Sequence, residues 1–176
     1  MILVILIIIL IVAVLIMYNN LVKARVRVKQ AASGIDVYLK QRFDLIPNLV
    51  ETVKGYSKHE QTILAEITAL RNSYMNQPEN LKNAENLNNK MNQLVAVAEA
   101  YPDLKASEQY LNLQKTLSKL ESQLQAARRI YNSEVAEYNQ KLETVPSNIV
   151  ASLFGFVHAD LFEIKEVERQ NVKIEL

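Results

Sequence analysis

Acidic, amide and imidazole side chains gather around a proline in RFDLIPNLVETVKGYSKHE, residues 42–60. Asp44 and Glu51 lie on either side of Pro47, and paired carboxylates can perform general acid–base catalysis when their pKa values are split. An Asp just before a helix more often satisfies free backbone N–H groups, and an acid one turn into the helix favours the macrodipole. We therefore predict a structural role for both carboxylates, at a helix that begins near Pro47.

The chain has two histidines and no cysteine, which restricts metal chemistry. His59 precedes Glu60, but a zinc site on a helix needs a second His four residues further on, and that position is Ile63. His158 lies far along the chain, near two acidic residues. We expect no metal and no other cofactor, and we interpret His59 as a residue on a helix surface.

Several site classes have no motif in this sequence. It has no Gly-rich phosphate loop and no recognisable nucleophile–base pair, and its net charge of +1 does not indicate a nucleic-acid partner. We expect a protein that is not an enzyme and has no small-molecule substrate. A hydrolase that uses Asp44, Glu51 and His59 is an alternative that requires these side chains to converge.

The first 17 residues, MILVILIIILIVAVLIM, contain no charged or polar side chain. As a helix they span roughly 25 Å, and continuing to Val22 completes a typical hydrocarbon core of about 30 Å. We predict an uncleaved transmembrane anchor over residues 1–22, with a cleaved signal peptide and a buried core helix as alternatives. The residues assigned to the anchor are Ile2, Leu6, Leu10, Val14, Met17 and Tyr18, the last as an aromatic interface residue.

Four basic residues directly follow the anchor: Lys23, Arg25, Arg27 and Lys29. Only the α-amino group precedes the anchor, so the positive-inside rule predicts that the rest of the chain lies in the cytoplasm. This basic collar can also contact anionic headgroups, at roughly 1 kcal/mol per charge. The sequence therefore predicts a single-pass protein of the bacterial inner membrane with a lipid partner.

Scarce Gly and many Leu, Ala, Glu, Lys, Gln and Asn indicate an all-α protein. Apolar stripes predict four long helices: from the anchor to about Arg42, from Pro47 to about Tyr74, from Pro78 to about Tyr101, and from Asp103, as an N-cap, to about Thr144. The fourth stripe runs from Tyr110 to Val145 with heptad-like spacing. Short connections favour an up-and-down antiparallel four-helix bundle over residues 23–146. A single helix kinked at Pro47 and pairing between subunits are alternatives.

After Pro146 the pattern changes. Residues 147–176 form a separate C-terminal segment, rich in apolar side chains up to Phe162 and ending in NVKIEL, which alternates as a short strand does. Such a strand needs a partner edge, whereas a frayed tail needs none. We predict Phe154, Phe156 and Phe162 as interaction residues in this segment. Asp44, Pro47, Asn48 and Glu51 are the candidates around the first proline.

Five runs resemble the bacterial LemA family: YNNLVKAR, IDVYLKQRFDLIPNLVETVKGYSKHE, AEAYPDLKA, LQAARRIYNSEVAEYN, and GF with a following FE. The chain departs from the family in AASG, residues 31–34, where an aromatic Trp is often found. The resemblance implies one N-terminal transmembrane helix and a cytoplasmic helical bundle. It implies no established enzymatic reaction, and a similar protein of magnetosome membrane formation suggests membrane organisation.

These observations favour a membrane-anchored scaffold or interaction protein that forms a homo-oligomer or binds other membrane proteins. The alternative is a membrane-tethered sensory or regulatory module acting on a membrane protease or kinase. That alternative predicts a polar cavity in the bundle, lined by residues such as Asn48, Tyr56 and Asn132.

Overall fold

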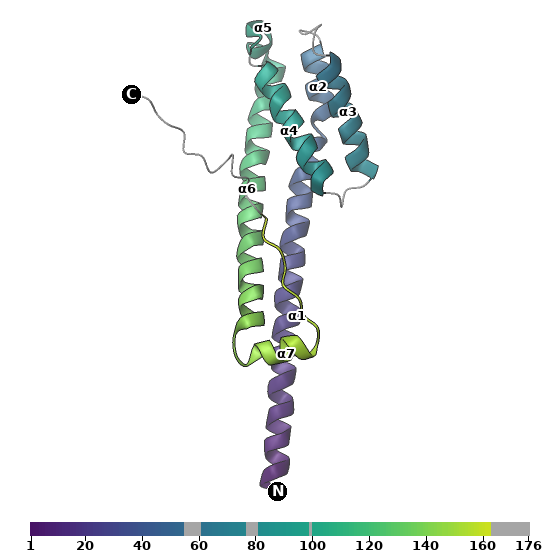
Figure 1. The fold of residues 1–176 in the computed structure, drawn as a ribbon. Helices are drawn as coiled ribbons and strands as arrows, with labels where there is room; N and C mark the ends of the chain where they lie inside the picture. Colours follow the sequence, from purple (N-terminus) through teal and green to yellow (C-terminus); the bar gives the residue numbers. More distant parts are fainter. Residues whose placement is uncertain (55–60, 77–80, 99, 163–176) are drawn as a thin grey trace, which may run out of the picture. The chain divides into compact units, whose positions relative to one another are not determined.

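A computed structural model describes residues 1–54, 61–76, 81–98 and 100–162. Within these ranges every regular element is a helix and no strand occurs, which confirms the all-α class. The helices are α1 (Ile2–Phe43), α2 (Ile46–Lys54), α3 (Gln61–Asn76), α4 (Leu81–Ala98), α5 (Pro102–Lys105), α6 (Glu108–Glu143) and α7 (Ser147–Leu153) (Figure 1). The tail NVKIEL lies outside the described residues.

The chain forms two compact units. The first contains residues 1–34 and the described residues from 126 onward; the second contains residues 35–125. α1 and α6 are each continuous helices that contribute one end to each unit. The first unit therefore holds the apolar N-terminus, the end of α6, α7 and the segment that follows it.

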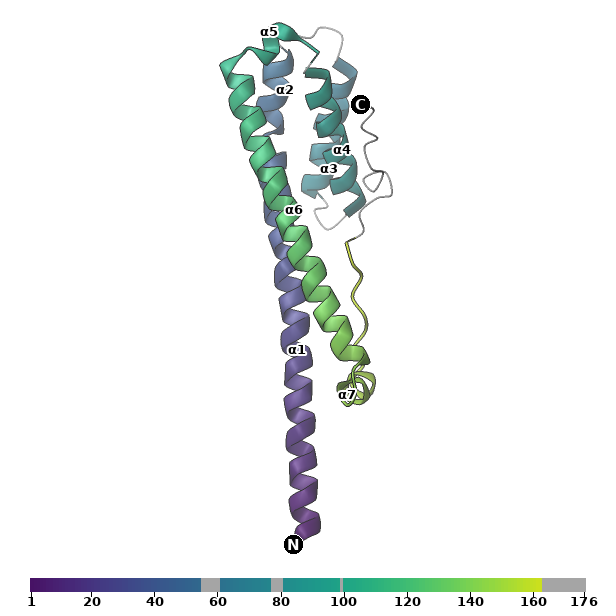
Figure 2. The ribbon, with the colours of Figure 1, turned by 90° about the vertical axis from the view of Figure 1, so that its left-hand side faces the viewer.

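α1 has 42 residues, which corresponds to a helix about 63 Å long. Every side chain from Ile2 to Val12 is exposed, and these N-terminal turns extend beyond α7 (Figures 1 and 2). Among the described helices, the one beginning at Ile2 is long and apolar enough to cross a membrane. Its exposed apolar surface is what a membrane-spanning segment requires, because lipid rather than protein then covers it.

The core of the first unit joins three helices. Its buried residues are Leu21, Ala24 and Val28 from α1, Val135, Tyr138 and Leu142 from α6, and Val150 and Ala151 from α7. The members from α1 recur at spacings of three and four, and so do those from α6, which places each set on one helix face.

Gly155 allows the chain to reverse after α7. Its φ of 69° lies in the left-handed region, where a side chain would be strained. The Phe156 N–H donates to the Ala151 carbonyl at 2.9 Å, and the Gly155 N–H donates to the Ser152 carbonyl at 3.3 Å. These two bonds form a Schellman motif, which satisfies the last carbonyls of the helix. The chain then continues back along α6.

The second unit is built around α3, which packs against both α2 and α4. Phe43, at the end of α1, meets Tyr74 of α3 edge to face, with 4.7 Å between ring centroids. Arg42 is only 4% exposed, and its guanidinium binds the Glu121 carboxylate and the Asn92 side-chain oxygen, the latter at 2.6 Å. A charge is thus buried among apolar neighbours with hydrogen-bonding partners, as the cost of desolvation requires.

The predicted first helix is confirmed, since α1 ends at Phe43. The second prediction corresponds to α2 and α3, separated from α1 by a two-residue turn at Asp44 and Leu45, and Pro47 is the second residue of α2. The residues between α2 and α3 lie outside the described ranges, as does Pro78, the predicted start of the third helix. α4 corresponds to the predicted third helix.

The prediction of one continuous fourth helix was wrong. α5 ends at Lys105 and α6 begins at Glu108, with the Ser107 hydroxyl accepting a hydrogen bond from the Tyr110 N–H at 3.5 Å. Asp103 does not cap a helix, because it lies in the first turn of α5 behind Pro102 at the first position. Ser is a preferred N-cap residue, and this is the local reason for a new start at residue 108.

Candidate interaction site

Two Tyr-Asn pairs on α6 hold the extended segment 157–162. Tyr131-Asn132 and Tyr138-Asn139 are seven residues apart, which is about two helical turns, so equivalent side chains project from the same face. Both views of the first unit show this segment running beside α6 (Figures 1 and 2). We call these four residues the Tyr-Asn clamp.

Each asparagine of the clamp binds both polar groups of one backbone residue. The Asn139 amide donates to the Ala159 carbonyl at 2.8 Å and accepts from the Ala159 N–H at 3.0 Å. The Asn132 amide does the same with Phe162, at 3.0 and 2.7 Å. An amide side chain here replaces the hydrogen bonds that a neighbouring strand would supply.

Each tyrosine of the clamp donates its hydroxyl to another carbonyl of the segment. Tyr138 Oη lies 2.9 Å from the Val157 oxygen, and Tyr131 Oη lies 2.9 Å from the Asp160 oxygen. Burial raises the pKa of both phenols, and the Asp160 charge contributes a further increase at Tyr131. The neutral phenol, which is the form that donates the hydrogen bond, is therefore stabilised.

Three predicted interaction residues lie around this segment. The Tyr18 ring of α1 lies 4.9 Å from the Phe154 ring and 5.7 Å from the Phe156 ring, between centroids. Arg25 lies over the Phe156 ring at 5.1 Å, and Arg128 lies over the Phe162 ring at 4.6 Å. The three phenylalanines thus hold the segment through rings and cations, and the clamp holds it through the backbone.

Arg27 differs from the other members of the basic collar. Its guanidinium binds Glu134 at 2.9 Å and Glu137 at 2.5 Å, both on α6, while Lys23, Arg25 and Lys29 are exposed. A hydrogen bond from Lys141, at 2.6 Å, together with Arg27, lowers the pKa of Glu137. Arg27 therefore joins α1 to α6, and three basic side chains remain exposed beside the apolar stretch.

Comparison with known proteins agrees with the motifs noted above. A model of the LemA family matches residues 31–176, which is most of the chain and includes the whole clamp and the segment it holds.

The chain belongs to the LemA family.

Individual relatives support this membership. The protein LemA of Metamycoplasma hominis is 27% identical over 158 residues, which cover 88% of this chain and 72% of the relative. Magnetosome proteins MamQ 1 and MamQ 2 of Paramagnetospirillum magneticum are each 30% identical over 77 residues, which cover 44% of this chain and 28% of each relative. The likeness to the MamQ proteins is thus confined to a part of each molecule.

The LemA family run around Pro47 lies in the second unit, apart from the clamp. Pro47 and Glu51 line a surface pocket of about 290 Å³ together with residues of α2 and α3, including Lys54 and Arg71. Asp44 Oδ1 lies 3.9 Å from Arg71 Nη2, and Asn48 is exposed. His59, the third member of the hydrolase alternative, lies outside the described residues.

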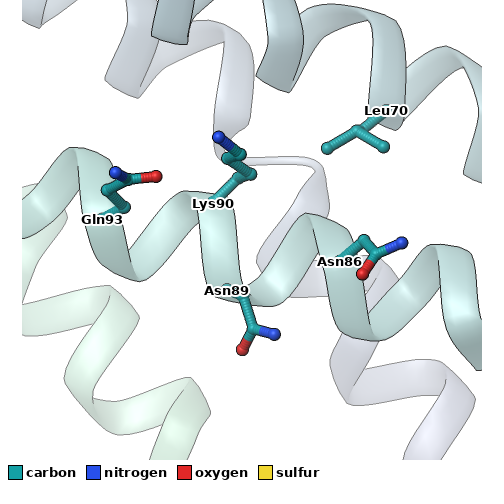
Figure 3. A pocket seen from close by; sticks show the side chains of 5 residues that line it. All are labelled: Leu70, Asn86, Asn89, Lys90 and Gln93. Atoms are coloured by element: carbon teal, nitrogen blue, oxygen red, sulfur yellow. The ribbon is translucent and has the colours of Figure 1, made fainter.

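A second surface pocket, of about 330 Å³, lies between α3 and α4. Leu70 of α3 lines it with Asn86, Asn89, Lys90 and Gln93 of α4 (Figure 3). Lys90 Nζ lies 2.6 Å from a Glu66 carboxylate oxygen, so its charge has a partner. Neither pocket includes Asn48 or Asn132, and Tyr56 lies outside the described residues.

The sequence reasoning did not identify the clamp or the buried Arg42. The clamp had one available signal, the dipeptide Tyr-Asn repeated at a heptad interval in YNSEVAEYN. In each pair the Tyr and the Asn are adjacent on the helix and lie beside its apolar face. This repeated position indicates that α6 makes a polar contact with another segment next to the core. Arg42 gave no such signal, because a lone Arg at the end of a helix is ordinarily exposed.

Proposed function

We propose that this LemA family member is a membrane-anchored helical scaffold that assembles with copies of itself or with other membrane proteins and has no catalytic activity. The observation that carries the proposal is the exposed, uncharged surface of α1 from Ile2 to Val12, which continues directly into a folded helical unit. Removing such a surface from water is favourable, and a lipid bilayer does so for an apolar helix of this length.

The proposed location is the inner membrane of a bacterium, with the folded units in the cytoplasm. Lys23, Arg25 and Lys29 are exposed immediately after the apolar stretch, which supports this orientation through the positive-inside rule. The relatives MamQ 1 and MamQ 2 are named as magnetosome proteins, which supports membrane organisation by analogy.

Self-association is the finer part of the proposal. The long helices α1 and α6 follow heptad-like apolar spacing, which supports both an up-and-down four-helix bundle within one chain and pairing between chains. Confinement to a plane raises the effective concentration of the chains, so weak contacts suffice for assembly.

Two measurements test the scaffold proposal on the full chain. Native mass measurement after gentle detergent extraction should give more than one copy per particle, and crosslinking in native membranes with mass spectrometry should identify neighbours. A particle that stays monomeric at high protein density, with no crosslinked protein neighbour, would contradict assembly. Conversion of a small molecule by the purified chain would contradict the absence of catalysis.

The pocket between α3 and α4 favours a second candidate, a regulatory module for a membrane protease or kinase. Four polar side chains of α4 line it with Leu70 of α3, and they offer hydrogen-bonding groups to a polar ligand. Under this candidate, crosslinking should recover one such enzyme as the main neighbour. Filling the pocket with Asn89→Trp should then reduce that crosslink, whereas Asn48→Trp on α2 should not.

A further inference from the structure

The surface around α7 is apolar although it belongs to a folded unit with its own core. Ile149 is 65% exposed, Leu153 75% and Val157 74%, and the Phe154 side chain is also exposed. On the opposite face of α7, Val150 and Ala151 are buried against α1 and α6. The helix therefore presents an apolar side to its own unit and a second apolar side outward.

α7 lies beside the part of α1 that belongs to the uncharged stretch. Val14, Met17 and Tyr18 pack against the core that α7 completes, and the Tyr18 ring contacts Phe154. The turns of α1 before Val14 extend beyond α7 (Figures 1 and 2). The exposed apolar side of α7 thus continues the exposed apolar surface of α1.

The position of Lys23, the first charged residue after this stretch, indicates how deep α7 lies relative to the membrane. Lys23 follows Tyr18 by five residues and Val14 by nine, so it lies roughly 8 to 14 Å further along α1. A membrane-spanning helix needs about 20 residues, and counting back from Lys23 these reach Leu3. Val14, Met17 and Tyr18 are therefore within the span, and the end of α7, where Phe154 contacts Tyr18, lies before Lys23 along α1.

Polar neighbours limit this depth to the interface. Glu143, Ser152 and His158 are exposed at the same end of the unit, and His158 Nε2 lies 4.0 Å from a Glu143 carboxylate oxygen. Charged groups are costly in the hydrocarbon core but are tolerated among headgroups, where tyrosine rings such as that of Tyr18 are enriched.

We propose that α7 is a second membrane contact, which lies in the plane of the lipid interface with Ile149, Leu153 and Phe154 against the acyl chains. Lys23, Arg25 and Lys29 then face anionic headgroups. This inference rests on the proposed anchoring of α1, and it adds an in-plane element of the kind that amphipathic interfacial helices provide.

The absence of cysteine makes a direct depth measurement available. The full chain is placed in vesicles of neutral and anionic lipids with a single environment-sensitive fluorophore on Ile149→Cys or Leu153→Cys. Quenching by lipids brominated at shallow or deep acyl positions reports depth. Leu10→Cys serves as the control for the span, and Ser133→Cys on an exposed position of α6 serves as the control for water.

The expected result is strong quenching of both α7 labels by shallow bromines, strong quenching at Leu10 by deep bromines, and little quenching at Ser133. If Leu10 is quenched but both α7 labels behave like Ser133, the second contact is overturned and the anchor stands. If Leu10 is not quenched either, the anchoring proposal itself fails, and the inference fails with it.

The alternative occupant of the α7 surface is a second copy of the chain. A dilution experiment distinguishes this protein contact from the lipid contact. Labels at Leu153 on two copies would show distance-dependent energy transfer that falls when unlabelled protein is added at constant total protein. The lipid contact predicts no such transfer above that of the Ser133 control. Transfer at Leu153 without quenching by brominated lipid would assign the surface to a protein interface and overturn the proposal.

Discussion

Asn132 and Asn139 each satisfy one N–H and one C=O of a segment that has no strand beside it among the described residues. A net hydrogen bond contributes about 1 kcal/mol, whereas fixing the backbone of one residue costs about 1–2 kcal/mol. The segment 157–162 therefore stays in place only when most of its bonds form together. The position of segment 157–162 therefore depends on two amide and two phenol side chains that hydrogen-bond to its backbone atoms.

Replacing Asn139 by Ala should release the segment from α6. The change removes two hydrogen bonds and leaves the Ala159 backbone without its side-chain partner, at a cost of about 1–3 kcal/mol. Hydrogen exchange read by mass spectrometry should become faster in residues 157–162. Ser133→Ala, at an exposed position of the same helix, is the matched control. Equal exchange in both variants would show that the clamp does not hold the segment.

Alkaline pH should loosen the same segment. The pKa values of Tyr131 and Tyr138 are raised in the folded state, so their contribution is fully present below the unfolded value of about 10 and is lost as pH rises through the folded values. Tyrosinate absorbance and hydrogen exchange should change together above that pH. In a variant with both Tyr131→Phe and Tyr138→Phe, the increase in exchange beyond the intrinsic effect of pH should be absent.

Removing Arg42 should destabilise the second unit. Arg42→Ala leaves the Glu121 carboxylate without this partner, but that side chain is 30% exposed, so water offsets part of the loss and we expect about 1–3 kcal/mol. Thermal unfolding followed by circular dichroism measures the change. Combining Arg42→Met with Glu121→Leu should recover part of it. A double variant less stable than Arg42→Ala would argue against an electrostatic origin.

Helix starts and ends determine how far this fold can be predicted from the sequence. The apolar stripe predicted from Pro47 to about Tyr74 includes Leu49, Val53 and Ile67, which are all buried, because burial of one face imposes a helical period. The fourth stripe extended too far, to Val145, which is 72% exposed because it lies beyond the end of α6 at Glu143. It also missed the break at Ser107. Caps act through one local hydrogen bond, which periodicity does not detect.

Long-range contacts of these elements were less predictable. The three phenylalanines after Pro146 were predicted as interaction residues, but nothing in their spacing indicated that segment 157–162 returns along α6. That course depends on the reversal at Gly155 and on bonds between residues about 20 to 30 positions apart. The sequence indicated the apolar residues of this region, whereas the polar clamp that orders it required the structure.

Two glycines provide a matched test of the α7 end. Gly155→Ala forces a side chain into a positive φ and should cost about 1–2 kcal/mol, opening the Schellman motif. Gly34→Ala in α1 meets nothing within 4 Å and should stabilise by about 0.5–1 kcal/mol, because Ala favours the helix. Chemical unfolding of both variants measures these changes. Stabilisation by Gly155→Ala would contradict the assigned conformation at Gly155.

At the scale of the whole molecule, α1 is one unbroken helix that belongs to the apolar stretch, to the first unit and, in its last residues, to the second. The apolar stretch and the folded units are thus not joined by a loop. The exposed charges beside the stretch decide which side of the membrane receives the folded units under our proposal.

Neutralising Lys23, Arg25 and Lys29 with Gln should weaken the preference for one orientation. Reaction of a Ser133→Cys variant with an impermeant thiol reagent, applied to intact or opened cells, measures the fraction on each side. Removing three other exposed charges, Lys105, Lys115 and Lys119, keeps the net charge equal and should leave the orientation unchanged. Identical labelling of both triple variants would show that the basic collar does not determine the orientation of the chain in the membrane.

The clamp holds its segment almost entirely through main-chain atoms. Val157, His158, Asp160 and Leu161 carry exposed side chains while their backbone course is fixed by α6. A foreign sequence substituted at these positions should keep the same course, because the side chains of the clamp hydrogen-bond only to main-chain atoms of the segment. A short epitope or recognition motif grafted there would therefore be presented in an extended conformation beside α6.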